Sequence, residues 1–100
     1  MKYKLLISDE AENDVEEAFI WYELQKIDLG FDFFKSIENG LKIINDFPRR
    51  FPIVHRNVRR CLVKKFPFCI YYYIDEVKSQ IKVIAVFHTS RNPKIWKRRK

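Results

Sequence analysis

His88 and Arg91 are the two side chains whose types and spacing come nearest to a catalytic site in this sequence. They lie three residues apart, where a predicted strand ends. A histidine there can transfer a proton, and an arginine can stabilise the charge that develops on a phosphate, which together would suit phosphodiester cleavage. The alternative is a hydrogen-bonded histidine that fixes the loop leading to Pro93. The spacing alone favours this second interpretation.

A second group of side chains could bind an acidic partner. If the strands form a meander, its members converge on one side of the sheet, where they could neutralise nucleic-acid phosphates or hold an acidic protein segment. The competing interpretation is a solvated basic edge that keeps the strands from pairing with other chains. Alternation along the strand places Arg59 and Arg60 on opposite faces, so we expect them to contribute unequally. The group consists of Arg59, Arg60, Lys64, Lys65, Arg91, Trp96, Lys97 and Arg98.

The charge of the chain is divided between its two halves. Residues 1–48 contain five Lys against eleven Asp and Glu, a net charge of −6. Residues 49–100 contain fifteen Lys and Arg against two acidic residues, a net charge of +13. The basic half also contains apolar strand-like runs, so we expect a folded surface rather than a disordered tail. A protein polarised in this way is suited to holding an acidic partner with its second half.

The remaining reactive side chains have structural explanations. Tyr71 and Tyr73 are predicted to face away from the core side of their strand, where they could stack on bases or simply pack. Cys61 and Cys69 flank a predicted turn and could face each other, as a redox-sensitive disulfide or, the favoured interpretation, as two buried thiols. The sequence has no glycine-rich phosphate loop, metal-ligand cluster or nucleophile motif. We therefore expect no cofactor and no metal.

Length and composition indicate one compact domain over residues 1–100. The chain is 47% hydrophobic and contains only two Gly and four Pro, which is typical of a globular fold with short connections. No stretch resembles a signal peptide, and the longest apolar run, residues 66–74, is less than half as long as a membrane span. We therefore expect a cytoplasmic protein that does not associate with membranes.

The elements that position these residues follow from hydrophobic periodicity. Residues 3–7 are predicted to form a strand, and Asp9 and Glu12 have the spacing of a capping box at the start of a helix. This helix breaks at residues 26–30, and a second one is predicted over about 31–46, with Gly40 marking a close packing contact. An irregular link then leads to strands over 58–65, 68–75 and 80–87 and to a short C-terminal helix that opens at Asn92-Pro93. This order, β-α-α-β-β-β, predicts an α+β fold in which an antiparallel sheet packs against a helical hairpin.

Several segments occur together along the chain in a characteristic order. They are Trp21-Tyr22, residues 28–33, residues 48–52, Arg59-Arg60, Phe66-Pro67-Phe68-Cys69-Ile70-Tyr71-Tyr72, and His88-Thr89-Ser90-Arg91-Asn92-Pro93 with Trp96. Together they resemble the RelE/ParE toxin superfamily and are closest to its ParE branch. The resemblance covers nearly the whole chain and implies the toxin of a type II toxin–antitoxin pair. It also implies a small α+β fold and a cognate antitoxin whose extended, partly helical C-terminal segment wraps the toxin.

The two branches imply different targets. The ParE branch implies inhibition of DNA gyrase through protein contacts, and the RelE branch implies cleavage of mRNA in the ribosomal A site. A nuclease of the RelE kind uses basic side chains on its middle strands, including an Arg on the third strand. Here residues 68–74 contain no Lys or Arg, and Cys69 occupies roughly the Arg position. Part of such a site could still come from Lys64, Lys65, His88, Arg91 and Trp96.

Three functional hypotheses follow. The leading one is a ParE-like toxin that inhibits DNA gyrase by protein binding and is neutralised by an acidic cognate antitoxin, with which it could form a hetero-oligomer. The second is a RelE-like, ribosome-dependent mRNA endonuclease, in which His88 and Arg91 would be the catalytic residues. The third is a basic nucleic-acid-binding module without catalysis. The sequence leaves open whether the protein is an enzyme.

Overall fold

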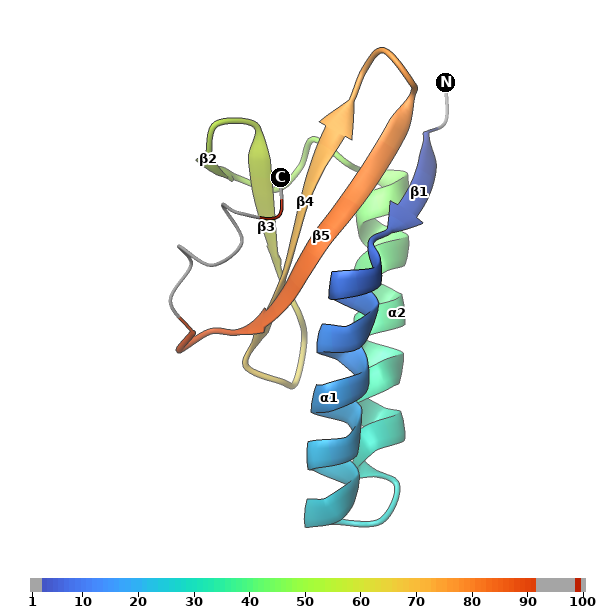
Figure 1. The fold of residues 1–100 in the computed structure, drawn as a ribbon, viewed down its shortest axis with the longest axis vertical. Coiled ribbons are helices and arrows are strands. Elements are labelled where there is room, and N and C mark those ends of the chain that lie inside the picture. Colours follow the sequence, from blue (N-terminus) through green and yellow to red (C-terminus); the bar gives the residue numbers. More distant parts are fainter. Residues whose placement is uncertain (1–2, 92–98, 100) are drawn as a thin grey trace.

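A computed structural model describes residues 3–91 and residue 99 of the chain. Two helices pack on one face of a five-stranded sheet, as Figure 1 shows, which confirms the predicted α+β class. The predicted C-terminal helix lies outside the described residues. The elements are β1 (Lys4–Ile7), α1 (Asp9–Gln25), α2 (Leu29–Asp46), β2 (Ile53–His55), β3 (Val58–Leu62), β4 (Phe68–Asp75) and β5 (Gln80–His88).

The first helix begins one residue earlier than the capping-box prediction implied. Ser8, in an extended backbone conformation, is the N-cap, and its Oγ accepts a hydrogen bond of 3.1 Å from the Ala11 backbone N–H. Asp9 is therefore the first helical residue, so its predicted N-cap role was wrong. A serine at this position satisfies one of the free backbone donors of the first turn. The carboxylates of the first turn interact favourably with the positive end of the helix dipole.

The bend between the helices depends on two residues that tolerate a tight backbone. Asp28 adopts a left-handed conformation with φ of 71°, and the Glu23 carboxylate accepts hydrogen bonds from the N–H groups of Asp28 and Gly30. A Cβ atom on Gly30 would lie 2.7 Å from the Phe19 carbonyl oxygen. Only glycine fits this approach of α2 to α1, and the second helix accordingly starts at Leu29, two residues before its predicted start.

The sheet has the strand order β1-β5-β4-β3-β2 and is not wholly antiparallel. The strands from β2 to β5 form the predicted meander, but β1 pairs in parallel with β5, with Lys4 opposite Gln80 and Ile7 opposite Val83. The predicted antiparallel sheet is therefore confirmed for β2 to β5, and the parallel pairing of β1 is an addition to it. The predicted irregular link also contains the short edge strand β2, which pairs with β3. After β1 the chain forms the two helices, which cover one face of the sheet, and it then enters the meander of β2 to β5.

Each face of the sheet has its own buried cluster. Ile70 and Tyr72 pack toward the helices, which confirms their predicted orientation, and Gly40 of α2 approaches Ile70 closely. Cys69 and Tyr71 belong to the cluster on the opposite face, with half-buried Tyr73 packed against it. A register shift between Tyr71 and Tyr72 interrupts the pairing with β5. Because Tyr71 is buried, packing explains it better than a stacking platform for bases.

The two cysteines do not face each other across the β3–β4 hairpin. Cys61 is opposite Ile70 in the register and packs toward the helices, whereas Cys69 packs on the other face. Both thiols are free and buried. Burial raises the pKa of Cys61 to about 11, and it also raises the pKa of Cys69. Neither cysteine is therefore suited to thiolate chemistry near neutral pH, as expected for two structural thiols.

Candidate functional site

His88 lies exposed at the end of β5, where its ring organises the following turn. The Ser90 backbone N–H donates to His88 Nδ1 over 3.0 Å, and Ser90 Oγ lies 2.8 Å from the same nitrogen. Because Nδ1 accepts the backbone hydrogen bond, a neutral His88 ring carries its proton on Nε2. The ring also packs edge-on to Phe68, with centroids 5.4 Å apart. These contacts agree with the loop-fixing interpretation, although the residue that the ring holds is Ser90; Pro93 lies outside the described residues.

Arg91 extends the turn that begins at His88. Its backbone N–H donates to the His88 carbonyl over 2.9 Å, and its guanidinium lies 4.1 Å from the centroid of the Phe87 ring. His88 and Arg91 both line an open groove of about 570 Å³ between α1 and the end of β5. The opposite wall of this groove includes the carboxylates of Asp14 and Glu17. The groove therefore has charges of both signs in its lining.

Arg59 and Arg60 have unequal environments, as alternation predicted. The Arg59 Nη1 atom donates to the carbonyl oxygens of Phe51, at 2.6 Å, and Arg49, at 3.1 Å, and so ties the loop before β2 to the sheet. Arg60 is exposed on the opposite face beside Tyr71. Burial raises the pKa of the Tyr71 phenol, and the positive charge of Arg60 offsets part of this rise. Arg59 thus has a structural role, while Arg60 is exposed and interacts with the Tyr71 phenol.

Lys64 and Lys65 are exposed in the turn between β3 and β4. They line a shallow groove of about 500 Å³ whose other side is the start of α2. The same end of the sheet carries the His88–Arg91 turn, because the Thr89 N–H donates to the Pro67 carbonyl over 2.8 Å. The structure therefore brings Lys64, Lys65 and Arg91 to one end of the sheet. The predicted binding residues Trp96, Lys97 and Arg98 lie outside the described residues.

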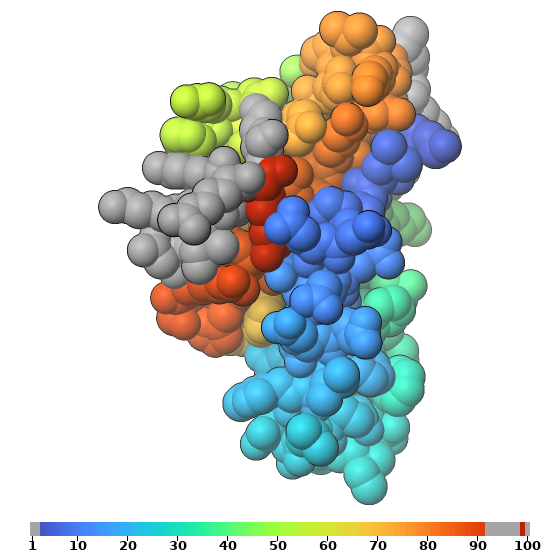
Figure 2. All heavy atoms as spheres, viewed as in Figure 1, coloured from blue at the N-terminus to red at the C-terminus, as the bar shows by residue number. Residues whose placement is uncertain are grey.

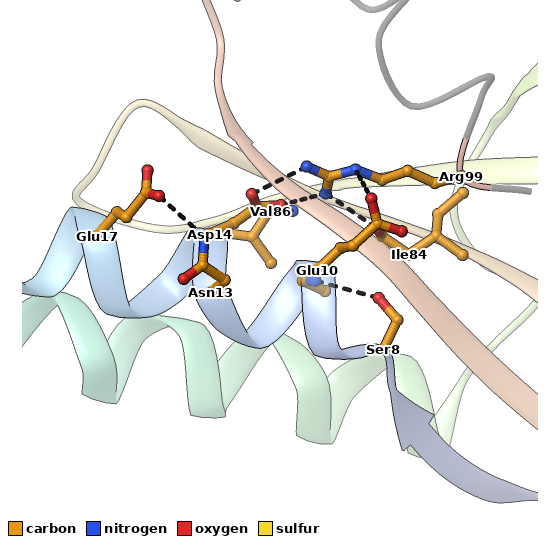
Figure 3. A network of polar contacts seen from close by, with 9 residues as sticks. Ser8, Glu10, Asn13, Asp14, Glu17, Ile84, Val86 and Arg99 are labelled. Atoms are coloured by element: carbon orange, nitrogen blue, oxygen red, sulfur yellow. Dashed lines mark hydrogen bonds and ion pairs between the residues drawn. The ribbon is translucent and has the colours of Figure 1, made fainter.

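An ion pair between Asp14 and Arg99 is the main feature that sequence reasoning missed (Figure 3). The Arg99 guanidinium binds Asp14 through two hydrogen bonds of 2.6 and 3.2 Å and donates to the Ile84 carbonyl over 3.2 Å. Glu10 adds a second carboxylate at 3.4 Å, and the Phe87 ring lies against the guanidinium. The hydrogen bonds to Asp14 raise the pKa of Arg99 above its ordinary value. These contacts fix residue 99 to α1 and β5.

Asp14 is the only buried charged residue in the described part of the chain. Its Oδ2 atom also accepts a hydrogen bond of 3.0 Å from the Val86 N–H, beyond the point where β1 stops pairing with β5. The Val86 N–H and the Ile84 carbonyl lie on β5 beyond its pairing with β1. Asp14 accepts the hydrogen bond of the first group, and Arg99 donates to the second, in place of a neighbouring strand. The sequence contained a signal for this role, because Asp14 falls on the apolar stripe of α1 between Ala11 and Ala18.

The described residues contain no cluster of His, Cys, Asp and Glu that could hold a metal ion. Within that same part of the chain, no helix is long and apolar enough to cross a membrane.

The fold of this chain is similar to the folds of solved proteins from toxin–antitoxin systems. Its solved neighbours include a protein described as the chromosomal ParDE system of P. aeruginosa, with a TM-score of 0.71, 14% identity, and coverage of 87% of this chain and 96% of that one. Another is the RelBE2 toxin–antitoxin complex of Mycobacterium tuberculosis, with a TM-score of 0.62, 13% identity, and coverage of 88% and 99%. No protein with a curated function matches the sequence significantly.

Comparison of the sequence with protein-family profiles identifies the family of this chain. Residues 5–93 match the profile of the family described as the ParE toxin of the type II toxin–antitoxin system parDE. The chain belongs to this family. The resemblance noted in the sequence is thereby confirmed, both for the superfamily and for the ParE branch.

Proposed function

We propose that this toxin acts by binding a protein target, DNA gyrase, and not by cleaving RNA. The proposal rests on the amino-acid residues of β4, the strand on which a RelE-like nuclease would place an Arg. This strand has no Lys or Arg, and its residues 68–72 are all buried in the two clusters of the sheet. Cys69, at roughly the Arg position, is only 2% exposed. No basic side chain of β4 is therefore available to a substrate.

The distribution of the other basic residues supports binding over catalysis. Arg59 is occupied by backbone carbonyls, and Lys64, Lys65 and Arg91 are spread along one end of the sheet beside Phe66 and Pro67. A catalytic site requires proton-transfer groups held in contact with one another and with the reacting atoms. A mixed surface of cations and aromatic rings suits a protein interface, in which Arg and aromatic residues are enriched. We therefore assign Arg60, Lys64, Lys65 and Arg91 to target binding, with Trp96, Lys97 and Arg98 as further candidates.

Neutralisation by a cognate antitoxin is part of the proposal. The charge of +13 in residues 49–100 favours an acidic antitoxin segment over this half of the protein. Such segments are commonly disordered when free and fold as they bind. Co-expression with the adjacent small gene should yield a toxin–antitoxin complex that copurifies, and a toxin that remains alone and harmless to cells would contradict the assignment.

A supercoiling assay tests the target directly. Purified toxin should inhibit supercoiling by DNA gyrase, and an equimolar amount of antitoxin should restore it. Lys64→Ala/Lys65→Ala should weaken inhibition, whereas Lys78→Ala, an exposed lysine at the opposite end of the sheet, should leave it unchanged. Full supercoiling activity at saturating toxin, with growth still arrested, would refute gyrase as the target.

A ribosome-dependent mRNA endonuclease is the second candidate. His88 and Arg91, the two residues that would transfer a proton and stabilise charge, line the same groove. Loss of a general acid or base costs about 10²–10⁴-fold in rate, so a nuclease should lose mRNA cleavage with His88→Ala while it still binds antitoxin. We expect instead that His88→Ala leaves supercoiling inhibition within about twofold of the wild type, apart from a loss of stability from the Ser90 contact. Ribosome-dependent cuts that vanish in this variant would establish the nuclease.

The third hypothesis, a nucleic-acid-binding module, has less support. The groove that contains His88 and Arg91 has Asp14 and Glu17 on its other wall, and Arg59 is engaged by the protein itself. A phosphate-binding surface would place its cations together without opposing carboxylates. Salt-dependent binding of DNA or RNA fragments at micromolar protein, in the absence of any protein target, would revive it.

A further inference from the structure

The shallow groove of about 500 Å³ between the start of α2 and the β3–β4 turn contains three lysines in its lining. Lys64 and Lys65 extend from the turn, and Lys35 lies on α2, within its second turn. All three are exposed, and among residues 3–91 and 99 none of them forms a hydrogen bond or an ion pair with its side chain. Because these positive charges are close together and unpaired in that part of the chain, this lysine groove attracts an anion.

The other polar residues of the lysine groove suit a phosphate. Ser36 and Asn39 add a hydroxyl and an amide beside Lys35, because residues three or four positions apart share one face of a helix. Ammonium, hydroxyl and amide groups are typical donors to the phosphate oxygens of nucleic acids. Asp32 is the one carboxylate among the described lining residues, so three Lys against one Asp leave a net charge of +2.

Lys65 has a backbone conformation that lysine seldom adopts. Its φ of 72° lies in the left-handed region, where Gly and Asn are the usual residues. The turn around it is closed by two hydrogen bonds, from the Val63 N–H to the Phe68 carbonyl over 2.9 Å and from the Phe68 N–H to the Phe66 carbonyl over 2.8 Å. Glycine would relieve the backbone at this position, but it would remove one of the three cations. A strained residue of this kind indicates that its side chain has a function.

The lysine groove continues into a wider basic surface at the same end of the sheet. Arg91 lies there, because the Thr89 N–H donates to the Pro67 carbonyl and holds the turn after β5 against the β3–β4 turn. Figure 2 shows these two turns, in orange-red and gold, next to each other at the lower end of the sheet. Cations spread over several positions suit an extended polyanion better than a single small anion.

We propose that the lysine groove binds backbone phosphates of the DNA that gyrase holds, so that the toxin binds the gyrase–DNA complex more tightly than gyrase alone. The inference rests on the proposed function, because it takes gyrase as the target protein. An acidic segment of gyrase itself is a less suitable ligand for this groove. Protein interfaces are depleted in Lys and enriched in Arg, and the described lining has three Lys and no Arg.

Three cations give a weak site that works only beside a second contact. Neutralising three phosphates gives a plot of log affinity against log salt concentration with a slope of about −2.7. Affinity for free DNA therefore falls about 40-fold between about 50 and 200 mM salt. When gyrase already holds both the toxin and the DNA, the groove meets its phosphates at high effective concentration. This requirement distinguishes the proposal from a nucleic-acid-binding module that acts alone.

The first test measures binding of the full chain, made by cell-free synthesis, to a short labelled DNA duplex at low salt. Lys35→Gln should make the salt slope less steep by about 0.9 and weaken binding about three- to tenfold at about 0.1 M salt. Lys42→Gln removes the same charge from an exposed position of α2 outside the groove lining and should change neither quantity. Asp32→Asn should strengthen binding about two- to threefold, because it removes the opposing charge. Equal effects of the two lysine variants would overturn the proposal.

The second test measures binding of the toxin to gyrase with and without bound DNA. DNA should tighten binding of the wild type, and Lys35→Gln should lose about three- to tenfold only when DNA is present. An equal loss without DNA would assign the groove to an acidic surface of gyrase and overturn the proposal. Pyrophosphate that binds the free toxin at micromolar concentration through Lys35 would assign the groove to a free phosphate ligand, and this result would also overturn it.

The groove assignment and the gyrase assignment fail in different ways. If the toxin inhibits supercoiling but Lys35→Gln binds the gyrase–DNA complex as tightly as the wild type, the groove assignment is wrong and gyrase stays the target. If the toxin binds gyrase neither with nor without DNA, the gyrase assignment fails, and the proposal of a gyrase–DNA complex fails with it. A salt slope on free DNA that still depends on Lys35 would then show a phosphate-binding groove that serves another nucleic-acid target.

Discussion

Replacing Asp14 with alanine should destabilise the protein more than replacing any other charged residue of α1. The substitution leaves the Arg99 guanidinium, whose side chain is 12% exposed, with only Glu10 and the Ile84 carbonyl as partners. It also leaves the Val86 N–H without its acceptor. Removing one partner of a buried ion pair costs about 3–5 kcal/mol, and an unsatisfied buried donor costs about 1–3 kcal/mol. Because Arg99 can turn toward water, we expect the low end, about 3 kcal/mol in total.

Urea unfolding followed by circular dichroism measures this loss. For a domain of this size, 3 kcal/mol corresponds to a fall in Tm of about 12–24 °C. A double-mutant cycle with Arg99→Ala should give a coupling energy above about 1 kcal/mol, because the two side chains share one network. Asn13→Ala serves as the control, because it changes the residue next to Asp14 and removes only an exposed hydrogen bond to Glu17. The free energy of unfolding should change by no more than about 0.5 kcal/mol. A loss below about 1 kcal/mol for Asp14→Ala, or strict additivity with Arg99→Ala, would refute the role assigned to the pair.

Three further predictions follow from the packing. Gly30→Ala should cost about 1–3 kcal/mol in thermal or urea unfolding, since its Cβ would press on the Phe19 carbonyl; a neutral effect would mean that the bend relaxes freely. Tyr72 donates to the Pro48 carbonyl over 2.6 Å, and burial raises its pKa to about 12. The phenol therefore ionises in the unfolded chain first, so its contribution is complete below about pH 10 and is lost as the pH rises from about 10 to 12. Tyr72→Phe should lower stability at pH 7 by about 1 kcal/mol and flatten the alkaline decline in urea midpoints, and an unchanged decline would place its origin elsewhere. Arg59→Ala should lower stability by about 1–2 kcal/mol through the freed Phe51 and Arg49 carbonyls, whereas Arg60→Ala should leave unfolding unchanged and reduce toxicity; the reverse pattern would contradict the assignment of their faces.

The sequence was informative where a pattern repeats over many residues. The apolar stripe of α2 and the β-branched and aromatic run from residue 68 to 75 specify their elements locally, and both formed as predicted. Strand pairing was less accessible, because β1 meets β5 through contacts between residues about 76 positions apart. The periodicity of a four-residue strand does not determine which neighbour it takes. The edge strand β2, with three residues, was too short to give any pattern.

The candidate site was only partly predictable for a related reason. Alternation along β3 correctly separated Arg59 from Arg60, since the period of a strand fixes the face of each side chain. Composition could not reveal that Arg59 would bind backbone carbonyls while Lys64 and Lys65 stayed exposed, because both outcomes depend on the path of the loop before β2. The acidic lining of the groove beside His88 likewise arises only when α1 packs against β5.

The parallel pairing of β1 with β5 means that the sheet of this toxin can be completed only late in synthesis. During synthesis, residues 4–7 have no strand partner until residues 80–83 have been made, and Asp14 has no cation until residue 99 follows. Domains dominated by such distant contacts fold more slowly than those built from local ones. The helical hairpin can form early, but the end of the sheet that carries Lys64, Lys65 and Arg91 is completed only with β5. A nascent or truncated chain that lacks β5 should therefore be inactive as a toxin, because the basic end of its sheet is not yet assembled.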